Sequence, residues 1–180
     1  MSLLLFLDID GVLNNEQWWD ENCTKNREQN RPYFRSIFCT ANTQWLKKLY
    51  TSQPTTIVIS SSWRKLYTMD ELKAIFKANG LKESLIFSVT PYSYYSRGLE
   101  IKEWIKKHTI VTVNHDTMLI IDDTVHDIYK EFDKINIIRV DSKVGFNEKC
   151  YKEALSKIQK QQMEKGICIK SISKNLVQQQ

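Results

Sequence analysis

Three features are missing from this sequence, and each absence argues against a class of protein. The four cysteines are scattered and include no Cys-x-x-Cys pair. This predicts free thiols in a reducing cytoplasm, without a disulfide framework or a zinc site. No apolar run approaches the roughly 20 residues that a membrane-spanning helix needs. Neither a Gly-x4-Gly-Lys-Ser/Thr loop nor a Gly-x-Gly-x-x-Gly loop is present, so two common phosphate-binding folds find no support.

The composition is that of one soluble globular domain. The chain has 180 residues, of which 42% are hydrophobic and 26% are charged, with a formal net charge of +5. The basic balance indicates either an ordinary solvated surface or a field that attracts phosphates or nucleic acid. The Leu-rich start at residues 3–7 lacks a basic flank and leads directly into acids, so we expect a strand there and not a signal peptide.

Short apolar runs alternate with helical patterns along the chain. We expect strands at residues 3–7, 56–60, 85–89, 118–121 and 135–140. Helices are expected at residues 40–50, from the capping box at 68–71 to Gly80, from Gly98 onward, at 125–132 and from 146 to about 162. Such alternation predicts an α/β fold, with a mostly parallel sheet flanked by helices on both faces.

The domain is expected to span residues 1–162, with a lid or small cap-like insert at residues 14–38. Residues 163–180 would form a C-terminal tail, in which residues 166–172 could add an edge strand before the terminal glutamines fray.

Polar clusters follow three of the predicted strands. Asp8 and Asp10 end the first, Ser60 begins a serine run after the second, and Asp122 and Asp123 end the fourth. If these strands are parallel neighbours, the clusters meet in one crevice beyond the carboxyl ends. Several carboxylates there predict a hard cation, with magnesium fitting best. One carboxylate could attack phosphorus and a second could move protons, so the pattern predicts phosphoryl transfer.

The motifs also resemble a known family. Asp8-Ile-Asp-Gly-Val, Ile57-Val-Ile-Ser and Leu119-Ile-Ile-Asp-Asp resemble the first, second and fourth motifs of the haloacid dehalogenase (HAD) superfamily, in that order. With RGLEIKEWI and VDSKVGF, they resemble the HAD domain of Swiss Army Knife RNA repair proteins over roughly residues 3–160. This resemblance implies a Rossmann-like fold without a large cap domain and a magnesium-dependent phosphatase.

The resemblance also implies roles for individual residues. Asp8 would be the nucleophile and a metal ligand. Asp10 would be the general acid/base, with its backbone carbonyl on the metal. Ser60 would donate a hydrogen bond to the phosphoryl oxygens. The metal site would be completed by two further acids: Asp122 and Asp123.

Other candidate positions keep alternatives open. The third motif supplies a Lys or an Arg, for which Arg97 is the first candidate and Lys102 the second, and Arg97 could equally be a solvated residue at a helix start. Ser61 could replace the preceding serine in binding phosphate. Arg64 could order the acidic site or contact substrate, and Asp127 could orient a metal-bound water.

The segment 14–38 interleaves aromatic residues with arginines. Trp18 and Trp19 could stack on bases, or they could pack the segment onto the body, whereas Trp63 is expected in the core. The basic charge balance, together with the resemblance to the RNA repair family, implies a nucleotide or a nucleic-acid end phosphate as the expected substrate. A small-metabolite phosphatase and a catalytically silent HAD-fold binding module are the alternatives, and the intact Asp8 and Asp10 argue against the silent module.

Overall fold

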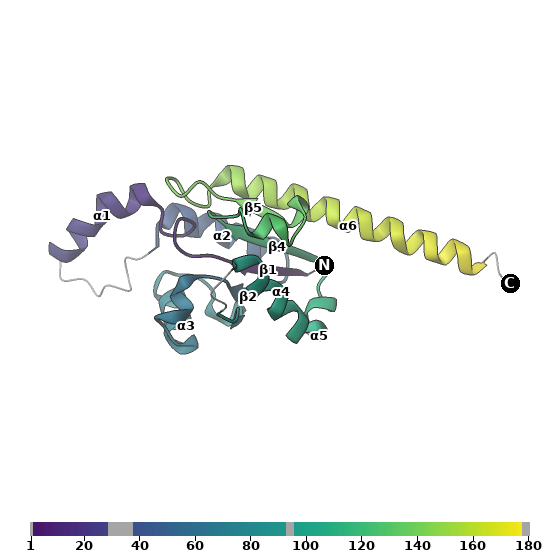
Figure 1. Cartoon of the computed structure of the whole chain (residues 1–180). Helices are drawn as coiled ribbons and strands as arrows, with labels where there is room; N and C mark the ends of the chain where they lie inside the picture. The colour runs from purple at the N-terminus through teal and green to yellow at the C-terminus, as the bar shows by residue number, and fades with distance from the viewer. Residues whose placement is uncertain (1, 29–37, 93–95, 178–180) are drawn as a thin grey trace.

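A five-stranded parallel sheet forms the centre of the molecule (Figure 1). The computed structural model describes residues 2–28, 38–92 and 96–177. Its strands are β1 (Leu3–Leu7), β2 (Thr55–Ile59), β3 (Ile86–Val89), β4 (Thr117–Asp122) and β5 (Ile137–Arg139). They lie in the order β3-β2-β1-β4-β5, and every neighbouring pair is parallel. The predicted α/β architecture is confirmed.

Helices connect the strands and cover the sheet. They are α1 (Glu16–Glu28), α2 (Thr40–Ser52), α3 (Met69–Ala78), α4 (Arg97–Lys107), α5 (Thr109–Val113) and α6 (Glu148–Val177). Short 3-10 turns are η2 (Ser62–Lys65), η3 (Glu83–Leu85), η4 (Ile128–Lys130) and η5 (Lys134–Asn136). The predicted capping box at Thr68 and Glu71 is present at the start of α3. None of the helices in the described part of the chain is both long and apolar enough to cross a membrane.

Two sequence predictions about helices were wrong. Residues 166–172 do not form an edge strand, because they continue α6, which extends well past the sheet (Figure 1). A single solvent-facing Gly166 costs a helix only about 1 kcal/mol, so it need not end one. The helix expected at residues 125–132 is reduced to the three residues of η4. The terminal glutamines at 178–180 lie outside the described residues.

Side chains of the central strand alternate between two apolar cores. Leu3, Leu5 and Leu7 face the core that contains α2, α3 and α6, whereas Leu4 and Phe6 face the core that contains α4. All five are fully buried. A strand covered on both faces reads as a continuous apolar run, which is why the sequence predicted it correctly.

The strand order places the candidate functional residues together. Leu7 is in register with Ile59 of β2 and with Ile121 of β4, so the residues that follow these three strands emerge at one level. The strand order reverses at β1, because β2 and β3 lie on one side of it and β4 and β5 lie on the other. In a parallel sheet, such a reversal leaves a crevice at the carboxyl ends of the two adjacent strands, here β1 and β4. Helix α1 lies beyond these ends, in the segment predicted as a lid (Figure 1). The described residues contain no large cap domain, and residues 29–37 lie outside them.

Candidate active site

Three aspartates meet at the carboxyl ends of β1 and β4. Asp8, Asp122 and Asp123 each place one carboxylate oxygen within 4.8 Å of the others. Asp8 is 5% exposed and Asp122 is 1% exposed. The backbone N–H of Ile9 donates to Asp8 Oδ1 at 2.8 Å, which holds this carboxylate in place. The crevice predicted from the strand ends therefore exists and contains the predicted acids.

Arg97 lies among these carboxylates. Its Nη1 is 3.1 Å from Asp8 Oδ2 and 2.9 Å from Asp122 Oδ2, and it also donates to the carbonyl of Ser60. Lys102, the other candidate for the third motif, pairs instead with Glu131 at 2.6 Å on the surface. The structure thus brings Arg97, and not Lys102, to the aspartates.

The single positive charge of Arg97 does not neutralise the negative charges of the three aspartates. Burial raises the pKa of Asp8, against the opposing effects of Arg97 and of hydrogen bonds from Ser61 and Ile9. Burial, followed by the charge of Asp8, raises the pKa of Asp122 well above its usual range. A divalent cation would offset this repulsion, and carboxylate oxygens are the ligands that hard cations prefer. The donor set therefore fits a metal ion held by the three aspartates.

The three serines after β2 point to different partners. Hydrogen bonding from the Ser61 side chain lowers the pKa of the Asp8 carboxyl. The Ser60 hydroxyl oxygen lies 3.5 Å from Oγ1 of Thr90, on the side of β3. Ser62 Oγ donates to Asp10 Oδ2 at 3.2 Å. Ser61, the alternative to Ser60, is therefore the serine whose hydroxyl contacts Asp8.

Asp10 is solvent-exposed and is held by three donors. Besides Ser62, Asn14 Nδ2 donates to Asp10 Oδ1 at 2.8 Å and Trp63 Nε1 donates to the same oxygen at 2.9 Å. Trp63 also packs against Phe38, so the core role predicted for it is only part of its function. Neither Asn14 nor Trp63 was predicted from the sequence as a contact of Asp10. The available signal was their position in the chain, since Asn14 follows shortly after β1 and Trp63 shortly after β2.

Asp127 fixes the start of α4. Its Oδ2 accepts hydrogen bonds from Ser96 Oγ at 3.0 Å, from the backbone N–H of Arg97 at 2.6 Å and from that of Gly98 at 3.4 Å. Burial raises the pKa of Asp127, but these hydrogen bonds outweigh burial and the net pKa is lowered. A carboxylate is favoured at a helix N-terminus by the helix dipole. Asp127 thus anchors the residue that carries the guanidinium, a contact different from the predicted metal-bound water.

Arg64 joins η2 to α4 beneath the site. Its guanidinium pairs with Glu100 and donates to the carbonyl of Ser61. The two paired side chains are only 5% and 4% exposed. Burial lowers the pKa of Arg64, and the charge of Glu100 opposes this effect. Of the two predicted roles for Arg64, ordering the acidic site is the one these contacts support.

A family model described as the HAD domain in Swiss Army Knife RNA repair proteins matches residues 4–150. The chain belongs to this HAD domain family. The matched region runs from β1 into α6 and includes every aspartate of the cluster as well as Arg97. The searches of curated proteins and of solved structures gave no match.

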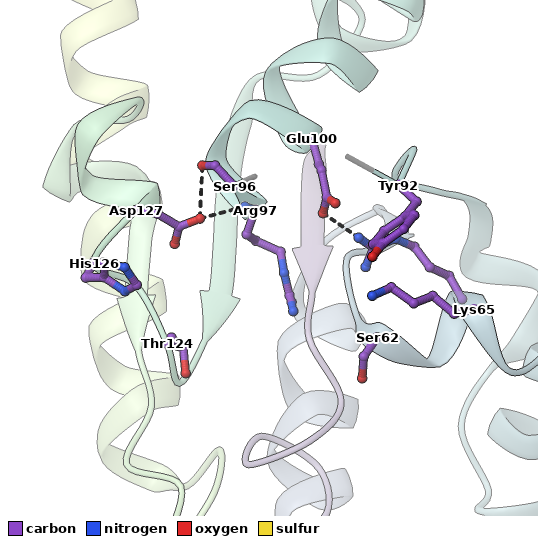
Figure 2. Close-up of a pocket in the computed structure, with 10 residues that line it drawn as sticks. Ser62, Lys65, Tyr92, Ser96, Arg97, Glu100, Thr124, His126 and Asp127 are labelled. Carbon is purple, nitrogen blue, oxygen red and sulfur yellow. Dashed lines mark hydrogen bonds and ion pairs between the residues drawn. The ribbon is translucent and has the colours of Figure 1, made fainter. Parts of the chain in front are cut away.

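Among the described residues, two hollows border the site of this HAD domain. The first has a volume of about 330 Å³ and is lined by residues of η2, the β3–α4 loop, α4 and the β4–η4 loop, among them Ser62, Lys65, Tyr92, Arg97, Thr124 and His126 (Figure 2). The second has a volume of about 340 Å³ and is lined by Asp10, Asn14, Glu16, Trp19 and Asp20. Trp18 lines a separate hollow with Trp45, so in these described hollows the two predicted base-stacking tryptophans lie apart.

Proposed function

We propose that this HAD domain is a magnesium-dependent phosphohydrolase that acts through an aspartyl-phosphate on Asp8. One observation carries the proposal: a buried Asp8 lies against two further aspartates and Arg97, while the exposed Asp10 stands two residues away. A binding module that only holds a ligand would need neither a nucleophile nor an acid/base pair. The geometry therefore supports turnover over the catalytically silent alternative.

The proposed reaction has two steps. A carboxylate oxygen of Asp8 attacks the phosphorus of a phosphate monoester, the bond to the leaving oxygen breaks, and Asp10 gives that oxygen a proton. Asp10 then takes a proton from water, and the resulting hydroxide attacks the phosphorus and releases inorganic phosphate from Asp8. Trp63 and Asn14 support this role because they hold the Asp10 carboxylate in one orientation.

The remaining residues would hold the transferred group. Arg97 offers positive charge to the phosphoryl oxygens, and Ser61 offers a hydroxyl beside Asp8. We favour Ser61 over Ser60 for this contact because the Ser60 side chain is turned toward Thr90. Magnesium would be held by Asp8, Asp122 and Asp123, with the backbone carbonyl of Asp10 as a further ligand. It would supply charge that offsets the phosphate and the carboxylates.

The proposed substrate is a nucleotide or a nucleic-acid end phosphate. The name of the family refers to RNA repair, and the net charge of +5 favours polyanionic substrates. A site without a large cap among the described residues leaves room for a bulky leaving group. The free thiols of Cys39 and Cys150 agree with the cytoplasmic location that we propose. A small-metabolite phosphatase is the second candidate, because the same aspartates would serve either substrate.

Phosphate release tests this function. The substrates are an aryl phosphate, nucleoside monophosphates and oligonucleotides phosphorylated at the 3′ or the 5′ end, each with magnesium and with a chelator. We expect chelator-sensitive release that Asp8→Asn lowers about 1,000-fold or more. Asp70→Asn, at an exposed position in the first turn of α3, is the matched control and should retain activity. Near-normal turnover by Asp8→Asn would refute the nucleophile, and preference for small substrates would favour the second candidate.

A further inference from the structure

The two hollows that border the site differ in charge. The first is lined by three cationic side chains: Arg64, Lys65 and Arg97. Its lining also has two acids, Glu100 and Asp127, which leaves three positive against two negative charges, a net charge of +1. Arg64 pairs with Glu100, and Arg97 pairs with Asp8 and Asp122. We call this hollow the cationic pocket.

The second hollow, which we call the acidic pocket, is lined among the described residues by three carboxylates, Asp10, Glu16 and Asp20, and by no described cationic side chain. The two pockets meet at Asp10, to which Ser62 of the cationic pocket donates a hydrogen bond. A leaving group that receives a proton from Asp10 can therefore extend into either pocket. The charge of the leaving group decides between them.

We propose that the nucleoside at a phosphorylated nucleic-acid end lies in the cationic pocket, where Lys65 binds the adjacent phosphodiester and Tyr92 stacks on a base. This inference rests on the proposed function and specifies which pocket holds the nucleoside and which residues bind it. Figure 2 shows Arg97 between Lys65 and Tyr92 on one side and Thr124 and His126 on the other. The phosphoryl group at Arg97 would thus have Lys65 and Tyr92 within the same pocket.

Lys65 and Tyr92 contact each other in a way that a bound strand could replace. The Lys65 ammonium lies 3.8 Å from the centre of the Tyr92 ring, and both side chains are exposed. A cation over an exposed ring is held weakly, so a phosphodiester can compete with the ring for the ammonium while the exposed ring contacts a base. A small metabolite without a second phosphate or an aromatic group would use neither residue.

Size and charge agree with this placement. A volume of about 330 Å³ lies at the small end of ligand pockets, which suits one nucleoside. In the acidic pocket, a phosphodiester would approach three carboxylates, and like charges repel most strongly where solvent is partly excluded. Trp19, one of the predicted base-stacking residues, lines that acidic pocket. A strand that carries charge is therefore expected to pass Lys65 and Tyr92 and to avoid Trp19.

Binding of a labelled tetranucleotide tests the inference without turnover. Fluorescence anisotropy with magnesium is measured on the full chain carrying Asp8→Asn, using tetranucleotides phosphorylated at the 3′ or the 5′ end. Lys65→Ala and Tyr92→Ala should each weaken binding of the preferred end at least fivefold. Tyr92→Phe, which keeps the ring, and Lys106→Ala, which removes an exposed charge on α4 outside the pocket, should stay within twofold. A larger loss from Trp19→Ala than from either pocket variant overturns the inference.

A chemical change in the ligand isolates the lysine contact. Replacing the phosphodiester next to the terminal phosphate by a neutral methylphosphonate should weaken binding when Lys65 is present and should have no further effect in Lys65→Ala. Lys65→Ala should also reduce the slope of log K against log salt by about 0.7. Equal losses from the methylphosphonate with and without Lys65 contradict the proposed contact.

These results are separable from the proposed function. Phosphate release from an aryl phosphate by the unaltered chain tests hydrolysis alone. Absence of release together with Lys65-dependent binding would refute hydrolysis and support the pocket. Release together with equal binding by all variants would support hydrolysis and refute the pocket.

Discussion

At the scale of single residues, Asp127 shows how a side chain outside the aspartate cluster controls it. Its carboxylate binds the first N–H groups of α4, including that of Arg97. The guanidinium of the same Arg97 pairs with Asp8, so Asp127 helps to position this contact. The pKa of Asp127 is lowered in the folded protein because three donors together outweigh its partial burial. Its charged form therefore contributes more to the folded state than to the unfolded chain.

The pH dependence of Asp127→Asn follows from that shift. A lowered folded-state pKa stabilises the protein above the ordinary Asp pKa of about 3.9, and this contribution is lost as the pH falls through the folded-state value. At pH 6, Asp127→Asn should cost about 0.5–1 kcal/mol in the free energy of unfolding. The difference from the unaltered chain should shrink below about pH 4. Urea denaturation at several pH values checks this, and a difference that grows toward low pH would contradict it.

Gly11 is a second residue with an effect on the cluster. Its φ is +69°, a left-handed conformation, and a Cβ there would collide with the carboxylate of Asp123. Gly11→Ala should cost about 1–2 kcal/mol from the backbone alone and should also displace Asp123, which weakens magnesium binding. Gly80→Ala is the matched control, since Gly80 also has φ +69° but a Cβ there would meet only the flexible end of Lys47. Urea denaturation and a magnesium titration of both variants separate the two effects.

At the scale of elements, a buried ion pair joins η2 to α4. Arg64 pairs with Glu100, and the same guanidinium holds the carbonyl of Ser61. These two elements carry Ser61 and Arg97, which lie on either side of Asp8. Packing between η2 and α4 is therefore expected to set the distance between the Ser61 hydroxyl and the Arg97 guanidinium.

Glu100→Ala tests that link. Removing one partner leaves Arg64 charged, buried and without its carboxylate, so we expect a loss of about 3–5 kcal/mol in the free energy of unfolding. Glu103→Ala on the same helix removes an exposed pair with Lys107 and should cost less than about 1 kcal/mol. Urea denaturation of the two variants checks the contrast. Similar losses for both would show that burial of the Arg64–Glu100 pair is energetically unimportant.

At the scale of the whole molecule, the parallel sheet forces like charges together. The register of β1 with β4 brings Asp8 next to Asp122, although 114 positions separate them in the chain. The stability of the central strands is thereby linked to whatever offsets this charge. A ligand that binds only the folded state raises the free energy of unfolding, by about 2.7 kcal/mol at 100 times its dissociation constant.

Magnesium should therefore raise the midpoint of thermal unfolding. The increase should depend on concentration and should be reversed by a chelator. Asp123→Asn should lose most of this response because it removes one of the three carboxylates, whereas Asp70→Asn should keep it. Differential scanning calorimetry checks the prediction, and an equal response from all three chains would place the metal elsewhere.

Several features could be predicted because they depend on local sequence. The strand Leu3–Leu7 is apolar throughout, and the capping box at Thr68 has the required Glu71 three residues later. The meeting of Asp8 with Asp122 and Asp123 followed from parallel strand ends. The edge strand predicted at residues 166–172 was wrong because this weakly patterned stretch continues α6, and its local sequence does not distinguish a strand from a longer helix.

The sequence by itself determined which chemistry is available: aspartates after two apolar strands, a serine run after a third, and a cation at the start of a helix. Only the tertiary structure decided which members of these groups meet. Backbone turns after β2 direct Ser61 to Asp8 and Ser60 to Thr90, although the two serines are adjacent. The choice of Arg97 over Lys102 depends on the direction of α4, whose first turn is held by Asp127. Such directions arise from long-range packing, which residue spacing does not encode.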